Sequence, residues 1–305
     1  MKLKDQVAIV TGAGRNIGEE VAKLFAAEGA RIAVVDLDRS RGQRSVDGIK
    51  AQGGDAELFV TDVSKGADVA AMVKAVVGRF GHIDILVNNV AISDNKSLLE
   101  ITEEDWDRVM AVTLKSQFLM SKHVAQQMIA QGTGGKIVNV GSTSGWQGRP
   151  RATAYSAAKA AIANFTRTIA VQLAPHNIRV NAIVPNKIGS PVGRDEFDPT
   201  RPVANMLKRA GRPEEAAKAI LFLASDDSSF VIGENLFVSQ QTRVPSEPRD
   251  RTPSDGVKGE RIRKLAVGVG LRTQRVGLGF EGLHSIGAGG KPRRRHLAAC
   301  KLHER

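Results

Sequence analysis

The chain has 305 residues, of which 42% are hydrophobic and 25% are charged, and its formal net charge is +12. Cys300 is the only cysteine, which excludes an intrachain disulfide, and no apolar stretch is long enough for a signal peptide or a membrane span. The six histidines show no metal-ligand spacing, so we expect a cytoplasmic protein that binds no metal and no membrane.

Short apolar runs, typical of buried strands, alternate with longer runs of helical period over the first 238 residues. This alternation predicts an α/β protein with a three-layer, doubly wound architecture around a seven-stranded parallel sheet. Strands are predicted at 6–10, 31–35, 56–60, 83–88, 135–140, 178–183 and 235–238. Helices are predicted at 17–28, 40–52, 65–79, 103–131, 152–174 and 214–224.

A glycine-rich turn, from Thr11 to Gly18, follows the first predicted strand. Glycines let the backbone approach a pyrophosphate, and the N-terminus of the next helix offers free N–H groups to it. The second strand ends in Asp36, where an acid can accept hydrogen bonds from an adenosine ribose. The alternative is that Asp36 only caps the following helix.

Tyr155, the only tyrosine, lies four residues before Lys159 and thirteen after Ser142. On one helix, a four-residue step places the phenol and the ammonium on the same face, about 5 to 6 Å apart at Cβ. A cation there stabilises the phenolate and lowers the tyrosine pKa from its usual value near 10, so that the phenol can act as a general acid and base. The Ser142 hydroxyl can then hold the reacting oxygen, unless it merely caps a strand end.

These motifs, together with Asn88-Asn89-Val90-Ala91 after the fourth strand, resemble the short-chain dehydrogenase/reductase family over residues 1–238. The resemblance implies a Rossmann fold and an NAD(P)-dependent oxidoreductase that interconverts a secondary alcohol and a ketone. It also implies a homotetramer or dimer, built through the long helices and the C-terminal strand. The altered ending at Ser239 puts the contact through that strand in question.

The resemblance assigns roles to residues that follow the predicted strands. Cofactor-binding residues are Gly12, Gly14, Arg15, Asn16, Ile17, Gly18, Asp36, Asp62, Val63, Asn89, Tyr155, Lys159, Pro185, Ile188 and Ser190. Catalytic residues are Ser142, Tyr155, Lys159 and Thr113, and Ser142 and Tyr155 also bind substrate. Trp146 and Arg149 are expected to bind substrate for another reason, because they lie between Ser142 and Tyr155 in sequence, at the mouth of the pocket.

Some positions depart from the family pattern, and Thr113 is the most consequential of them. It stands where the family has an asparagine that steadies a water linking the lysine to solvent, and we expect this relay to survive in weakened form. Asn16, Ala91 and Asn186 stand where the family has glycine, and these are mild changes. The polar segment 187–210 is expected to form a substrate lid rather than a plain surface loop.

Charges near the second strand bear on the choice of cofactor. The Asp36 carboxylate would repel a 2′-phosphate and favours NAD(H), whereas Arg15 and Arg39 could attract that phosphate to NADP(H). Arg149 and its neighbour Arg151 hint at an anionic or acyl-thioester substrate, although such arginines are more often solvated or bridge subunits. The alternative activity, which the resemblance implies because it is common among close relatives in the family, is reduction of a 3-oxoacyl thioester carried by an acyl carrier protein.

The catalytic domain is expected to span 1–239, and residues 240–305 to form a basic, low-complexity, disordered extension. This extension holds 15 of the 44 basic residues but only 6 of the 32 acidic ones. It has too few apolar residues to fold alone, and no stacking aromatics accompany its charge, so nucleic-acid binding is not favoured. A non-catalytic dinucleotide-binding or nucleic-acid-binding protein remains the alternative, and a reading-frame change after codon 238 would also explain the extension.

Overall fold

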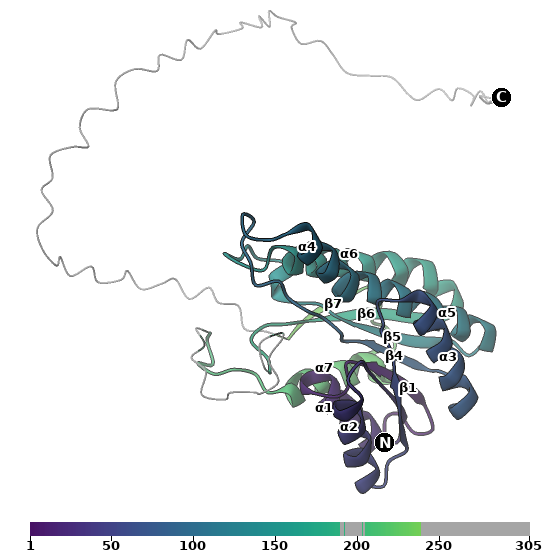
Figure 1. Cartoon of the computed structure of the whole chain (residues 1–305). Coiled ribbons are helices and arrows are strands. Elements are labelled where there is room, and N and C mark those ends of the chain that lie inside the picture. Colours follow the sequence, from purple (N-terminus) through teal and green to yellow (C-terminus); the bar gives the residue numbers. More distant parts are fainter. Residues whose placement is uncertain (190–191, 193–202, 204, 239–305) are drawn as a thin grey trace, which may run out of the picture. The chain divides into compact units, whose positions relative to one another are not determined.

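The computed structural model describes residues 1–189, 192, 203 and 205–238 (Figure 1). The expected disordered extension at 240–305, most of the expected lid and the site residue Ser190 lie outside these residues.

Seven parallel strands form one sheet in the order β3-β2-β1-β4-β5-β6-β7. They are β1 (Val7–Thr11), β2 (Arg31–Asp36), β3 (Ala56–Val60), β4 (Ile85–Asn88), β5 (Gly135–Val140), β6 (Ile178–Pro185) and β7 (Asn235–Val238). The strand order reverses between β1 and β4, which pair directly with Val10 opposite Val87. In sheets of this kind, ligands bind at the carboxyl ends of the strands beside such a reversal.

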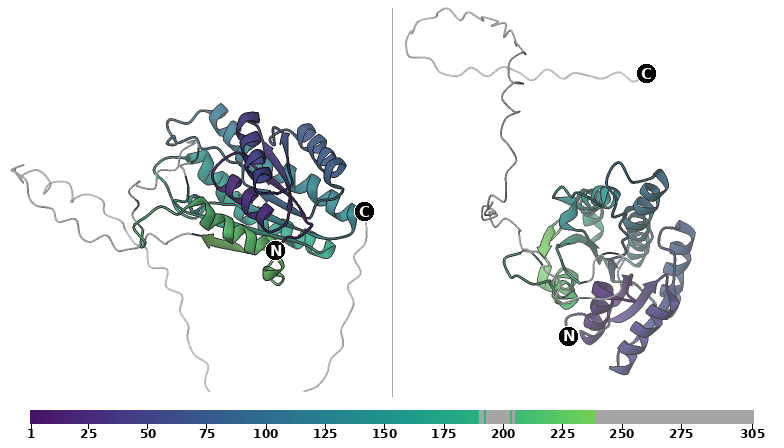
Figure 2. Two further views of the ribbon diagram at one scale, coloured as in Figure 1. Left: turned by 90° about the horizontal axis from the view of Figure 1, so that it is seen from below. Right: turned by 60° about the vertical axis from the view of Figure 1, so that its left-hand side comes forward.

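Helices cover both faces of the sheet, and the views in Figure 2 show the two helical layers from other directions. One face carries α1 (Asn16–Ala27), α2 (Arg39–Ala51) and α7 (Pro213–Ala224), and the other carries α3 (Gly66–Phe80), α4 (Glu103–Met110), α5 (Ser116–Gln131) and α6 (Thr153–Leu173). The doubly wound α/β architecture predicted from the sequence is thus confirmed.

The side chains of β1 show how alternation builds two cores. Ala8 and Val10 join the cluster under α1, α2 and α7, whereas Val7 and Ile9 join the cluster under α3, α5 and α6. All four are fully buried. For this reason, a parallel strand that helices cover on both faces has a continuous run of apolar residues in its sequence.

The predicted helix 103–131 is wrong in one respect, because it is not continuous. A capping box between Thr102 and Asp105 starts α4, and a π-helical turn, η1 (Ala111–Lys115), separates α4 from α5. Thr113 lies in this widened turn, where its hydroxyl accepts from the Ile92 N–H at 3.1 Å and donates to the Ile92 carbonyl at 3.0 Å. These bonds hold the turn against the segment after β4.

Candidate active site

The glycine-rich turn is held in place from β4. Asn89 donates through its backbone N–H to the Thr11 hydroxyl at 2.9 Å and through its side-chain amide to the Thr11 carbonyl at 3.0 Å. Gly12 has a left-handed φ of 62°, and a Cβ added to Gly18 would lie 2.2 Å from the Gly12 carbonyl oxygen. The turn therefore needs glycine at both positions, and Asn89 serves to fix its shape.

Asp36 lies against this turn at the end of β2. Its carboxylate accepts from the Gly14 N–H and from the Asp38 N–H, both at 2.9 Å. The side chain that caps α2 belongs to Asp38, which accepts from the Arg41 N–H, so the capping alternative for Asp36 is wrong. Asp36 is buried among backbone donors at the position expected for ribose recognition.

Positive charge surrounds the same carboxylate. Burial lowers the pKa of Arg15 and the charge of Arg41 lowers it further, while the carboxylates of Asp36 and Asp38 oppose this shift. The neighbourhood of Asp36 therefore combines two acids with two guanidinium groups. Its charges are more balanced than the sequence spacing alone indicated.

The start of α1 faces the segment that follows β6. Asn16 has a left-handed φ of 51°, and the side chain of the N-cap residue, Arg15, makes no capping hydrogen bond to α1. A Cβ added to Gly189 would lie 3.4 Å from the Asn16 side-chain oxygen, so the two segments adjoin. Ile17 is partly buried against the core beside α1, as is Ile188 from the second segment.

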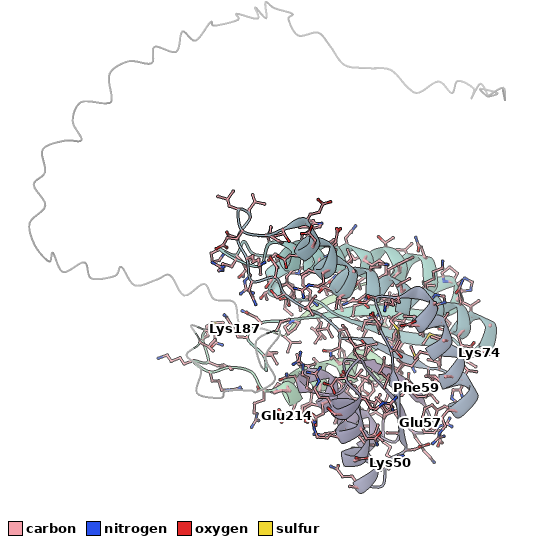
Figure 3. All side chains as sticks on the ribbon, in the orientation of Figure 1. Lys50, Glu57, Phe59, Lys74, Lys187 and Glu214 are labelled. Carbon is pink, nitrogen blue, oxygen red and sulfur yellow. The ribbon has the colours of Figure 1, made fainter. Side chains whose placement is uncertain are left out.

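The segment after Pro185 is tied to the start of α7. The Gly189 N–H donates to the Gly211 carbonyl at 2.9 Å, and the Gly211 N–H donates to the Lys187 carbonyl at 3.0 Å. Figure 3 labels Lys187 in this segment and Glu214 in the first turn of α7. The two ends of the expected lid are thereby joined to each other.

Asp62 and Val63 follow β3. The Asp62 carboxylate accepts from the Ser64 hydroxyl at 2.6 Å and from the Ser64 N–H at 3.0 Å. These bonds, led by the hydroxyl, lower the pKa of Asp62. Val63 packs into the core cluster that includes Val35, so only its backbone is placed for a contact at the sheet edge.

Ser142, Tyr155 and Lys159 come together at the carboxyl end of β5. All three are buried, and the Lys159 Nζ lies 5.6 Å from the centre of the Tyr155 ring. The Lys159 ammonium donates to the Val140 carbonyl at 2.7 Å. Ser142 does cap a short 3₁₀ turn, because its Oγ accepts from the Ser144 N–H at 3.1 Å, but its hydroxyl also lowers the pKa of the Tyr155 phenol.

The pKa of Tyr155 differs from the expectation. Burial raises it, and the Ser142 hydroxyl and the charge of Arg149 only partly oppose that effect. Burial also lowers the pKa of Lys159 to about 7, since the charged form of each group loses hydration. The spacing predicted that these side chains lie together, but burial sets the direction of both pKa shifts.

Thr113 and Trp146 make their contacts outside the cluster of Ser142, Tyr155 and Lys159. The Thr113 hydroxyl has its hydrogen committed to the Ile92 carbonyl, as described above, which leaves one lone pair for a further donor. Trp146 packs edge to face on Phe237 of β7, with ring centres 5.1 Å apart, and Arg167 lies 5.7 Å from its ring. A contact between Trp146 and substrate stays a prediction.

Two polar residues near Tyr155 were not predicted from the sequence. The Asp94 carboxylate accepts from the Tyr155 backbone N–H at 3.2 Å, and so substitutes for a capping side chain that α6 lacks. Ser144 receives hydrogen bonds from both Ser142 and Arg149. Asp94 is 61 residues from Tyr155 in sequence, so no spacing could have indicated its role.

Among the helices that the structure describes, none has the length and apolar character needed to cross a membrane. Within the same residues, no group of three or more His, Cys, Asp or Glu side chains could hold a metal ion.

The fold and the residues at the strand ends define the class of protein. It is a doubly wound α/β protein of the Rossmann type. A family profile described as Enoyl-(Acyl carrier protein) reductase matches residues 12–240. An uncharacterised oxidoreductase of Thermotoga maritima is 40% identical over 242 residues, covering 76% of this chain and 95% of that protein. The 3-oxoacyl-[acyl-carrier-protein] reductase FabG of the same organism is 39% identical over 237 residues, covering 77% and 96%.

A solved structure of 7α-hydroxysteroid dehydrogenase, in complex with NADH and 7-oxo glycochenodeoxycholic acid, superposes with a TM-score of 0.74. It is 32% identical and covers 78% of this chain and 94% of that one. The chain belongs to the short-chain dehydrogenase/reductase family, as predicted from its motifs. It is therefore an oxidoreductase that acts on CH–OH donors, from a family that uses NAD(P).

Proposed function

We propose that the protein interconverts a secondary alcohol and a ketone, with Tyr155 as the general acid and base. The observation that carries this proposal is the burial of Ser142, Tyr155 and Lys159 together at the carboxyl end of β5, with the Lys159 Nζ 5.6 Å from the centre of the Tyr155 ring. A phenol in this place can exchange a proton with an oxygen that the Ser142 hydroxyl holds.

The residues at the strand ends fit a nicotinamide dinucleotide. The glycine turn leaves no room for side chains at its contacts with Asp36 and Asn89, and the side chain of the N-cap residue, Arg15, makes no capping hydrogen bond to α1. The N–H groups of α1 would hold the pyrophosphate, and Asp36 would hold the adenosine ribose. When bound, the oxidised nicotinamide supplies a hydride acceptor and a positive charge.

In the oxidative direction, Tyr155 takes the hydroxyl proton as a phenolate while Ser142 holds the substrate oxygen. Burial alone opposes phenolate formation, so nearby positive charge must favour it. Lys159, with a pKa of about 7, is suited to exchange protons near neutrality. We assign it a second task, holding the nicotinamide ribose hydroxyls, and we assign Thr113 to the relay that returns the proton.

NAD(H) is our preferred cofactor, because the Asp36 carboxylate occupies the ribose-reading position itself and would repel a 2′-phosphate. Arg15 and Arg41 close by are the argument for NADP(H). Reduction of a 3-oxoacyl thioester is the second candidate activity, and the 39% identity to the Thermotoga maritima reductase favours it.

A homo-oligomer is also proposed, because several large apolar side chains are exposed on the described surface. Phe230 is 100% exposed and Val171, on α6, is 77% exposed. The segment containing Phe230 adjoins α6, since a Cβ added to Gly233 would lie 3.7 Å from the Ala170 Cβ. The cytoplasmic location expected from the sequence stays a prediction.

The test combines a substrate screen with one variant. Absorbance of the reduced cofactor is followed with NAD(H) and NADP(H) against secondary alcohols, sugars, steroids and 3-oxoacyl thioesters. Tyr155→Phe should lower kcat about 100- to 10,000-fold, the usual contribution of a general acid or base. NADH binding, measured by fluorescence titration, should persist; a variant that keeps full turnover would show that another acid is at work.

A further inference from the structure

Arg149 reaches the reacting groups from the segment between β5 and α6. Its guanidinium Nη1 donates to the Ser144 Oγ at 2.8 Å. The Ser142 hydroxyl donates to the same Ser144 oxygen at 3.1 Å. The guanidinium is therefore two hydrogen bonds away from the hydroxyl proposed to hold the substrate oxygen.

The charge of Arg149 acts on the Tyr155 phenol at the centre of the site. It lowers the pKa of Tyr155, against the effect of burial on that phenol. An electrostatic effect of this kind requires the guanidinium to lie near the phenol, which agrees with the hydrogen bonds through Ser144.

No carboxylate among the described residues forms an ion pair with Arg149, in contrast to Arg151 two positions later. Arg151 pairs with Glu100 at 3.1 Å and donates to the Asn95 carbonyl at 2.7 Å. A guanidinium has five N–H donors in a planar fork that matches a carboxylate. Arg149 uses one hydrogen bond to Ser144, so most of this fork is available to a ligand.

We propose that Arg149 binds a carboxylate of the substrate, so that the enzyme acts on hydroxy acids and their oxo-acid products. This inference rests on the proposed function, because it takes Ser142 and Tyr155 as the groups that hold the reacting oxygen. Only two hydrogen bonds separate the Ser142 hydroxyl from the Arg149 guanidinium. A substrate that reaches both groups would therefore carry its carboxylate one or two carbons from the carbinol carbon. The substrate class is then a 3-hydroxy or 4-hydroxy acid.

A purely structural role for Arg149 makes a different prediction. If the guanidinium only positioned Ser142 through Ser144, its loss would affect charged and neutral substrates alike. The deciding measurement is therefore a ratio of kcat/KM values for an acid and its uncharged ester, which share the same reacting carbon.

The experiment uses the full-length enzyme with NAD⁺ and two acid–ester pairs, 3-hydroxybutanoate and 4-hydroxypentanoate with their methyl esters. Wild type should prefer at least one acid to its ester. Arg149→Gln should lower that acid-to-ester ratio about 10- to 100-fold, as expected for hydrogen bonds to a charged group. Arg149→Lys should restore part of the ratio, and Arg151→Gln should leave it unchanged.

The failure of this inference can be told from the failure of the proposed function. A wild type that oxidises the esters or other neutral alcohols without preferring either acid overturns the role of Arg149 alone. An unchanged ratio in Arg149→Gln does the same. If no alcohol is oxidised at all, or if Tyr155→Phe is fully active, the proposed function is wrong and the inference fails with it.

Discussion

Lys159 is a lysine that the core buries almost completely, with 2% of its surface exposed. Burial lowers its pKa from 10.5 to about 7, and its ammonium has a single hydrogen bond, to the Val140 carbonyl. A charged group in this position costs free energy, because water would solvate it better than one carbonyl does. The site therefore carries a stability cost that its chemistry requires.

This cost predicts how stability depends on pH. The pKa is lower in the folded state, so the unfolded chain binds more protons between about pH 7 and pH 10.5, and unfolding becomes harder as pH rises through that window. Each unit of pKa difference corresponds to about 1.4 kcal/mol. The free energy of unfolding of wild type should rise relative to Lys159→Met from pH 7 to pH 9, as measured by urea denaturation.

Lys159→Met serves as the reference because other groups, Tyr155 among them, titrate at high pH in both proteins. Subtracting one unfolding free energy from the other removes these shared contributions. A difference that stays constant across the window would mean that Lys159 is hydrated, with an ordinary pKa.

At the scale of the elements, the glycine turn depends on the approach of α1 to the end of β1. Gly18→Ala would place a Cβ 2.2 Å from the Gly12 carbonyl oxygen, so the turn must open. We expect NADH affinity to fall at least tenfold, about 1.4 kcal/mol, because the N–H groups of α1 would shift from the pyrophosphate. Fluorescence titration with NADH measures this loss.

Gly78→Ala is the matched control for this substitution. Gly78 is exposed within α3, and a Cβ there would meet nothing within 4 Å. Alanine in a helix interior is more favourable than glycine by up to about 1 kcal/mol, so this variant should gain stability and bind NADH as wild type does. Equal NADH affinity in the two variants would contradict the role of the turn.

The π-helical turn between α4 and α5 depends on Thr113. Thr113→Val keeps the shape of the side chain but leaves the Ile92 N–H and carbonyl without their partner. Such a loss costs about 1 to 3 kcal/mol, so the free energy of unfolding measured by urea denaturation should fall by that amount. Thr113→Ser keeps the hydroxyl and should retain most of the wild-type stability.

The same residue tests the proposed relay. Thr113→Asn should raise turnover and alter its pH profile if the threonine supports the relay only weakly. Turnover and a pH profile identical to those of wild type would leave Thr113 with a structural role alone.

For the whole molecule, the sequence predicted the seven strands along the chain and the family, because both depend on local patterns. The apolar runs predicted the bounds of the strands to within a few residues. The spacing of Ser142, Tyr155 and Lys159 predicted that these side chains lie close together. The sequence did not predict the π-helical turn or the contact of Asp94 with α6. Both depend on segments that meet only after the chain has folded.

The direction of the Tyr155 pKa shift was also beyond the sequence, for a related reason. Spacing shows that a cation lies near the phenol, whereas desolvation depends on all the atoms that pack around it. The lack of an ion pair between Arg149 and any described carboxylate, on which the substrate inference depends, is likewise a property of the folded chain.

Assembly is the last property that belongs to the whole molecule. Exposed apolar side chains lie both near the C-terminal end of α6, with Phe230 and Val171, and on α5, where Phe118 is 46% exposed. Burying such side chains against a second copy removes apolar surface from water, at roughly 25 cal/mol per Å². We expect a homo-oligomer whose mass in sedimentation equilibrium is a multiple of the 32.6 kDa chain.

Two charge substitutions identify the face that is used. Phe230→Asp should lower the oligomer mass if the α6 face forms the contact, because an unpaired carboxylate would have to be buried there. Phe118→Asp should do so if α5 forms it, and a tetramer that uses both faces should fall to a dimer with either variant. A monomer at every concentration of wild type would show that these side chains face water, and that the site works within a single chain.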